Sequence, residues 1–264
     1  MKINGIKVAG ANVSAWRGRL RVAGMHFLVS AFVAGFVAAV VLPLWYPAAY
    51  RNVAGGWSLF SLLLGIHMCL GPLVTFLVLD ARKSPAILKR DLLLVALLQA
   101  AALIYGISVA VEARPVALVF SVDRFTLVSA NNVRQEELPH AASEFQRLSW
   151  SGPRLLATRL SAGTETFDAV LLASQGYDLA QRPMYWEPLS KQQQQAYLRG
   201  RPLSELLSRF SLSAPEFCKA YLLPPCAINE VRFLPLEARA GSWVVLLDAA
   251  GEVLGFAPFD GFEQ

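Results

Sequence analysis

Charged residues are scarce in this sequence. Asp, Glu, Lys and Arg make up 16% of its 264 residues and hydrophobic types make up 55%, whereas ordinary globular domains hold about 25% charged residues. The shortage is concentrated in residues 22–113, which contain nearly all of the long apolar runs. A chain folded entirely in water is therefore excluded, because this region requires a less polar solvent.

Histidine and cysteine are also rare, with three residues of each type. His140 is the only histidine beyond residue 113, which excludes a His-rich metal site in the C-terminal part. The sequence contains no Walker A, Rossmann, Gly-x-Ser-x-Gly or His-Glu-x-x-His pattern, and its acids show no catalytic pairing. We therefore expect no catalytic residue, no cofactor and no bound metal.

Basic charge is unevenly distributed along the chain. Residues 1–113 hold 10 Lys and Arg against 3 Asp and Glu, a net charge of +7, and residues 114–264 carry −2. The basic surplus flanks apolar runs, where it acts as a topology signal, and the C-terminal part offers no basic patch for phosphate. We expect membrane lipid as a partner and no nucleic acid.

Three apolar runs follow one another: Val22 to Tyr46, Ser58 to Leu79 and Leu92 to Val111. They contain 25, 22 and 20 residues without a charged side chain, and about 20 helical residues cross the hydrocarbon core of a bilayer. The first run is too long for the core of a cleaved signal peptide. The sequence predicts three transmembrane helices within residues 22–113.

Loop charges predict the orientation of these helices. Residues 1–21 contain five basic residues and no acid, and Arg51 is the only charged residue between the first two runs. The positive-inside rule places residues 1–21 in the cytoplasm as a basic tail. Three crossings then put residues 114–264 outside, which is the periplasm of a Gram-negative bacterium. The expected location is the bacterial inner membrane.

Small residues recur at four-residue spacing in the first and third runs. Such rows allow helix backbones to approach closely in lipid, where van der Waals contact replaces the hydrophobic effect. They either pack the protein's own helices together or dock the transmembrane helix of another protein. The rows are Ala31, Gly35 and Ala39, and Ala102, Gly106 and Ala110.

Two polar side chains lie well inside the predicted spans. His67 is the ionisable group of the second run, and it either hydrogen-bonds within the bundle or relays protons. Gln99 in the third run has an amide that can bond across to another helix.

The C-terminal part, residues 114–264, is expected to be an α+β domain. Strand-like runs predict a hairpin over residues 115–130, with Asp123-Arg124 at its turn, and another over residues 242–256; we expect both hairpins to share one sheet. Helices are expected between them, over residues 133–149, 165–173, 190–200, 204–210 and 214–221.

Several residues of this domain are candidates for specific roles. Cys218 and Cys226 favour a disulfide in an oxidising compartment, with free thiols or a metal site as alternatives. Arg114, Asp123 and Arg124 bracket the first hairpin at the expected membrane exit. They are interpreted as an interfacial anchor with turn residues, or as a docking contact for a membrane-proximal partner.

Five segments together resemble the TfpX/TfpZ family of type IV pilin accessory proteins. The similarity covers the chain from the first predicted span onward, although many relatives would have an acid at the position of His67. The segments are Trp45-Tyr46-Pro47, residues 70–75, residues 98–106, residues 114–125 and residues 243–248.

The resemblance implies a non-enzymatic accessory or chaperone role for a type IV major pilin. Other pilus assembly proteins are further expected partners. An enzyme that modifies pilin and a membrane scaffold that binds a ligand are the alternative hypotheses. The first lacks a catalytic motif, and the second lacks a cytoplasmic part large enough for signalling.

Overall fold

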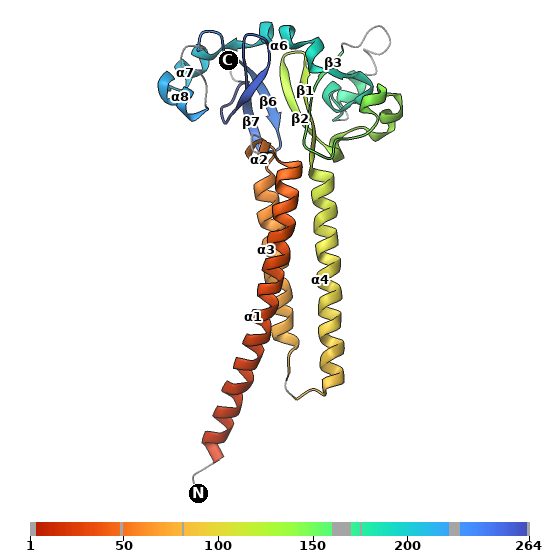
Figure 1. Ribbon diagram of the computed structural model, residues 1–264, viewed down its shortest axis with the longest axis vertical. Helices are drawn as coiled ribbons and strands as arrows, with labels where there is room; N and C mark the ends of the chain where they lie inside the picture. Colours follow the sequence, from red (N-terminus) through yellow and green to blue (C-terminus); the bar gives the residue numbers. More distant parts are fainter. Residues whose placement is uncertain are drawn as a thin grey trace. The chain divides into compact units, whose positions relative to one another are not determined.

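The computed structural model describes residues 4–47, 50–80, 82–159, 170–174, 176–221 and 228–262. It divides into two compact units. The helical unit contains Met1–Val41 and Trp57–Val111, and the sheet unit contains Leu42–Gly56 and Glu112–Gln264. Figure 1 shows the long helices and the sheet along the chain. The segment between the first two apolar runs is therefore part of the sheet unit, although it reads as a short loop in the sequence.

Three long helices account for the helical unit: α1 (Asn4–Trp45), α3 (Gly56–Val78) and α4 (Pro85–Ala113). Each is long and apolar enough to cross a membrane, as the sequence predicted. Phe32, Leu98 and Tyr105 remain 69–75% exposed on them. Water strongly disfavours an apolar surface of this extent, whereas lipid does not.

Polar side chains meet inside the helical unit. The amide of Gln99 on α4 donates to the main-chain oxygen of His67 on α3 (2.8 Å) and to Ser30 Oγ on α1 (3.2 Å). Gln99 therefore bonds to two other helices of this unit. A Cβ atom at Gly71 would overlap the carboxamide of Gln99, so this glycine makes the room that the amide occupies. The three helices are thus tied together by one side chain.

One sheet organises the other unit, in the order β4-β3-β1-β2-β6-β7-β8. Both predicted hairpins are confirmed, and β6 joins them in this sheet. The strands are β1 (Pro115–Ser121), β2 (Arg124–Ser129), β3 (Arg154–Thr158), β4 (Trp186–Pro188), β5 (Arg201–Pro202), β6 (Arg232–Ala238), β7 (Gly241–Leu247) and β8 (Val253–Ala257).

Strand β6 was missed by the sequence reading because it contains Pro235. Proline cannot donate to a ladder and normally argues against an interior strand. One edge of β6 pairs with β5 at Phe233 and with β2 at Leu236. Pro235 falls between these two pairings, where the neighbouring strand changes. Its missing N–H is therefore tolerated at this position of the sheet.

The helices predicted near residues 190–221 are confirmed, but the one over residues 133–149 is wrong. That region forms two short 3₁₀ helices, because Pro139 interrupts regular α-helical bonding. Of the helix expected over 165–173, residues 170–174 include a helical turn and 165–169 lie outside the described residues. The short helices are α2 (Tyr50–Val53), α6 (Gln193–Arg199), α7 (Leu203–Arg209), α8 (Ala214–Ala220), η1 (Ala130–Asn132), η2 (Gln135–His140), η3 (Ser143–Phe145), η4 (Leu179–Gln181), η5 (Pro183–Tyr185) and η6 (Leu189–Lys191).

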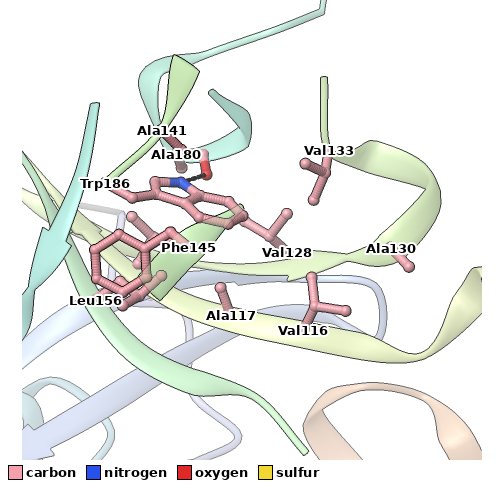
Figure 2. Packing of buried hydrophobic residues seen from close by; sticks show 11 residues of the cluster. Val116, Ala117, Val128, Ala130, Val133, Ala141, Phe145, Leu156, Ala180 and Trp186 are labelled. Atoms are coloured by element: carbon pink, nitrogen blue, oxygen red, sulfur yellow. Dashed lines mark hydrogen bonds between the residues drawn. The ribbon is translucent and has the colours of Figure 1, made fainter. Parts of the chain in front are cut away.

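Two clusters of buried side chains stabilise the sheet unit. Figure 2 shows the first, where Trp186 from β4 packs among apolar residues of β1, β2 and β3. The indole of Trp186 donates to the oxygen of Ala180 (2.9 Å), which satisfies its buried N–H. The second cluster joins α7 and α8 to β6 and β7, and it includes Leu206, Phe217 and Phe233.

Gly251, in the turn between β7 and β8, generates the first testable prediction. It has φ +78°, and a Cβ there would overlap the main-chain oxygen of Gln193. Gly251→Ala should lower the free energy of unfolding by about 2–5 kcal/mol, because backbone strain adds to the overlap. Gly241 is the matched control: its φ is +106° with nothing within 4 Å, so Gly241→Ala carries only the backbone term, about 1–2 kcal/mol. Denaturation of the purified protein in detergent measures the free energy of unfolding of both variants. Equal losses in Gly251→Ala and Gly241→Ala would contradict this prediction.

A second pair of variants tests the polar contact within the helical unit. Gly71→Ala should displace the Gln99 amide from its partners and destabilise the protein by about 1–2 kcal/mol, the upper range for an interhelical hydrogen bond in lipid. Gly65→Ala in the same helix meets nothing within 4 Å and should not destabilise it. Thermal unfolding in detergent distinguishes the two variants. An equal melting temperature for Gly71→Ala and wild type would contradict the assigned role of Gln99.

Candidate functional surfaces

The small-residue row of α1 is largely uncovered in the structure, with Ala31 half-buried. Gly35 and Ala39 are exposed, and a Cβ built on Gly35 meets no atom within 4 Å. Ala34, next to this row, is 1% exposed and therefore lies on the packed face of the helix. Within the described part of the chain, the row formed by Ala31, Gly35 and Ala39 is not filled by the protein's own helices.

The corresponding row of α4 behaves differently. Ala102 is exposed, Gly106 is half-buried with Leu63 of α3 at 3.9 Å from its built Cβ, and Ala110 is 2% exposed. Burial along this row therefore increases from Ala102 to Ala110, where the row is covered by the protein itself. Only the row on α1 leaves its central glycine free of contacts.

His67 lies in the interior of the helical unit. It is 8% exposed, and both of its ring nitrogens lie 3.4 Å from the Gln99 amide nitrogen. Among the residues that the structure describes, no carboxylate hydrogen-bonds to it, and no group of three His, Cys, Asp or Glu could hold a metal ion. His67 and Gln99 therefore form a polar contact between α3 and α4.

The three residues predicted at the membrane exit do not form one surface. Arg114 is buried: its Nε donates to Ser149 O (3.2 Å), and its guanidinium lies 4.2 Å from the centre of the Trp150 ring. Burial lowers the pKa of Arg114. Asp123 and Arg124 pair at 2.9 Å at the opposite end of β1, a seven-residue strand about 23 Å long. The Asp123 carboxylate raises the pKa of Arg124 by accepting its hydrogen bond.

Residues 42–47 and 50–56 form a collar that packs against the strands of the sheet unit. Tyr46 is fully buried and donates to Ala113 O (3.4 Å), which ties the end of α1 to the end of α4. The Tyr50 ring lies 4.9 Å from that of Phe256, and burial raises the pKa of Tyr50 to about 12. The sequence signal for this collar is its cluster of aromatic residues, Trp45, Tyr46 and Tyr50.

A polar cavity of about 270 Å³ was not foreseen from the sequence. It lies where β2 and β6 separate, beside the β6–β7 turn. No short motif marks it, because its residues come together only when the sheet forms. It is lined by Thr126, Leu127, Ser129, Asn131, Asn132, Gln181, Glu237, Ala238 and Arg239.

The cysteines occupy different environments. Cys218 is 2% exposed and lies within the core cluster of α7 and α8. Cys226 lies outside the described residues, so the pairing of the two stays a prediction. Cys69 is exposed on α3.

Comparison with known proteins supports a shared role with fimbrial assembly proteins. The family model for fimbrial assembly protein FimB matches residues 14–55, which include the α1 row and nearly all of the collar. Two relatives from Dichelobacter nodosus, the fimbrial assembly proteins of serogroup I and of serogroup E1, are 33% identical over 246 residues; the matches cover 92% of this chain and 96% of theirs. A third, of serogroups C1 and C2, is 37% identical over 121 residues, 46% of this chain and 92% of its own. No solved structure matches the chain.

These matches confirm the coarser part of the predicted resemblance, a fimbrial assembly protein, and leave the TfpX/TfpZ assignment as a prediction. The aligned region spans nearly all of both units, so the similarity to the fimbrial assembly proteins includes both units. The chain belongs to the family of these fimbrial assembly proteins.

Proposed function

We propose that this chain is a non-catalytic accessory protein of the bacterial inner membrane that stabilises a type IV pilin before it enters the fibre. The observation that carries the proposal is the largely uncovered row of Ala31, Gly35 and Ala39 on an apolar helix. A membrane-anchored pilus subunit presents an apolar helix of its own. Close contact between such helices in lipid requires small residues on one side, and this row supplies them.

The proposed topology follows from charge. Residues 1–21 are cytoplasmic, three helices cross the membrane within residues 22–113, and residues 114–264 lie in the periplasm. The five basic residues within residues 1–21 and the four in the segment between α3 and the hydrophobic part of α4 support this arrangement through the positive-inside rule. The sheet unit then lies on the side where a pilin carries its globular head.

The non-catalytic role is supported by the chemistry of the described side chains. Two acids of the sheet unit are held in ion pairs: Glu137 with Arg182 at 2.8 Å, and Asp123 with Arg124. In the helical unit, Gln99 is used in contacts with His67 and Ser30 on two other helices. A surface that binds and releases a subunit needs no reactive group.

The topology is tested by reporter fusions. Alkaline phosphatase, which folds to its active form only outside the cytoplasm, should be active when fused after Gln264 and inactive when fused after Ser84, in the loop between α3 and α4. A green fluorescent protein fusion at the same sites should give the opposite pattern. Phosphatase activity at Ser84 and none at Gln264 would contradict the proposed orientation.

The helix-docking surface is tested by cross-linking in cells that make the pilin. A cysteine at Gly35 should form an adduct with a cysteine in the pilin helix. Val40→Cys is the control, because Val40 is also exposed but points about 140° away on the helix. Gly35→Leu should fill the row and lower pilin abundance and surface pili, whereas Val40→Leu should not. Equal adduct yields at the two positions would exclude the row as the docking surface.

A further inference from the structure

The sheet has an open notch between β2 and β6. Strand β1 pairs with β2 as far as Pro115 and Ser129, with one register shift between Pro115 and Ala117. Strand β6 meets β2 at only two positions, Phe125 with Leu236 and Thr126 with Glu237. Beyond Thr126, no described strand pairs with residues 127–129 of β2 on the β6 side. A strand edge without a partner is a template for pairing with another chain.

The main-chain groups of this edge point into the notch. In an antiparallel pair, alternate residues direct both main-chain groups to the partner strand and the others away from it. Ala130 N–H donates to Arg114 O (3.0 Å), at the entry to β1. The alternation then places the main-chain groups of Leu127 and Ser129 on the open side of β2.

The cavity of about 270 Å³ occupies this notch. It is smaller than the roughly 300–1,000 Å³ of pockets for drug-sized ligands. Thr126 is only 5% exposed, yet its hydroxyl has no hydrogen-bond partner, and the Gln181 side-chain oxygen is likewise buried without one. Buried polar atoms are nearly always satisfied, so both groups indicate a missing polar ligand.

The notch lies at the end of the sheet where the chain arrives from α4. Ser129 pairs with Pro115, two residues after the end of that helix. On the other side, Ala240 N–H of the β6–β7 turn donates to Val53 O of the collar (3.4 Å). A partner segment bound here would therefore be the part of a protein that has just left the membrane.

We propose that the notch binds an extended segment of the pilus subunit, which adds to β2 as a short extra strand. This inference rests on the proposed function and names the contact made outside the lipid. The segment would pair its main chain with residues 127–129 and place small or polar side chains in the cavity. Strand addition derives affinity from main-chain bonds and specificity from such pockets. Glu237 and Arg239 at the mouth, one of each sign, disfavour a segment of strong single-sign charge.

Removal of one main-chain donor tests the pairing. Ser129 has φ −91° and ψ 157°, close to the conformation that proline requires, so Ser129→Pro removes the N–H facing the notch with little change to the strand. A photo-cross-linking residue at exposed Asn131 reports the bound segment in cells that make the pilin. Its adduct with pilin should fall about fivefold in Ser129→Pro, the weight of one hydrogen bond. Ser129→Ala keeps the N–H, so its yield should fall less.

The cross-link from Gly35→Cys separates the possible outcomes. If Ser129→Pro retains that adduct, the variant is folded and the loss at Asn131 belongs to the notch. A pilin adduct at Gly35 with none at Asn131 in the otherwise unaltered protein would overturn the strand-addition proposal and leave the proposed function standing. Adducts at neither site would overturn both. An adduct between two copies of this chain at Asn131, or equal losses in Ser129→Pro and Ser129→Ala, would also overturn the notch proposal.

Discussion

The burial of Tyr46 is the contact on which the sheet unit depends at its helical end. Its ring is fully enclosed, and its hydroxyl bonds to the main chain at Ala113. A Cβ at Gly56 would overlap the same ring, so the packing of Tyr46 requires a residue without a side chain at this position. Because the collar and the end of α4 meet through this residue, the ends of α1 and α4 are both fixed to the sheet unit.

Local periodicity accounts for the parts that the sequence predicted. Twenty or more uncharged residues in succession have few alternatives to a long apolar helix, and the first and last hairpins carry their turns within the strand pattern itself. Strand β6 was not predicted, because Pro235 is acceptable only where the neighbouring strand changes. The position of that change depends on the tertiary structure and is not visible in the sequence. The 3₁₀ segments around Pro139 have the composition of an α-helix but not its hydrogen bonds. The packing of the collar was not predicted for a similar reason. Its aromatic residues suit an interface with lipid as well as they suit a protein core.

Candidate surfaces were predicted less completely than the fold. The spacing of Ala31, Gly35 and Ala39 could be read directly, but exposure decides whether such a row packs internally, and exposure follows from how α1 turns its Ala34 face inward. Gln99 could be recognised as a polar group in an apolar run, but its partner Ser30 could not, because serine is common in helices that pack without it. The notch had no sequence signal at all. It exists because β6 ends its pairing with β2 after two residues, a property of strand geometry and not of any motif.

Each of the two proposed contacts can be weak by itself, because both engage the same subunit. A strand of about three residues adds only a few main-chain bonds, each with a small net free energy in water. A helix docked along one row of small residues also gains modestly, because lipid competes equally well for the remaining apolar surface. When both contacts engage one subunit, the second becomes intramolecular, and its effective concentration can reach the millimolar range. Release of either contact then sharply reduces the affinity of the whole. A protein that protects a subunit and later surrenders it to a growing fibre requires this kind of binding, which is tight in sum and easily broken in steps.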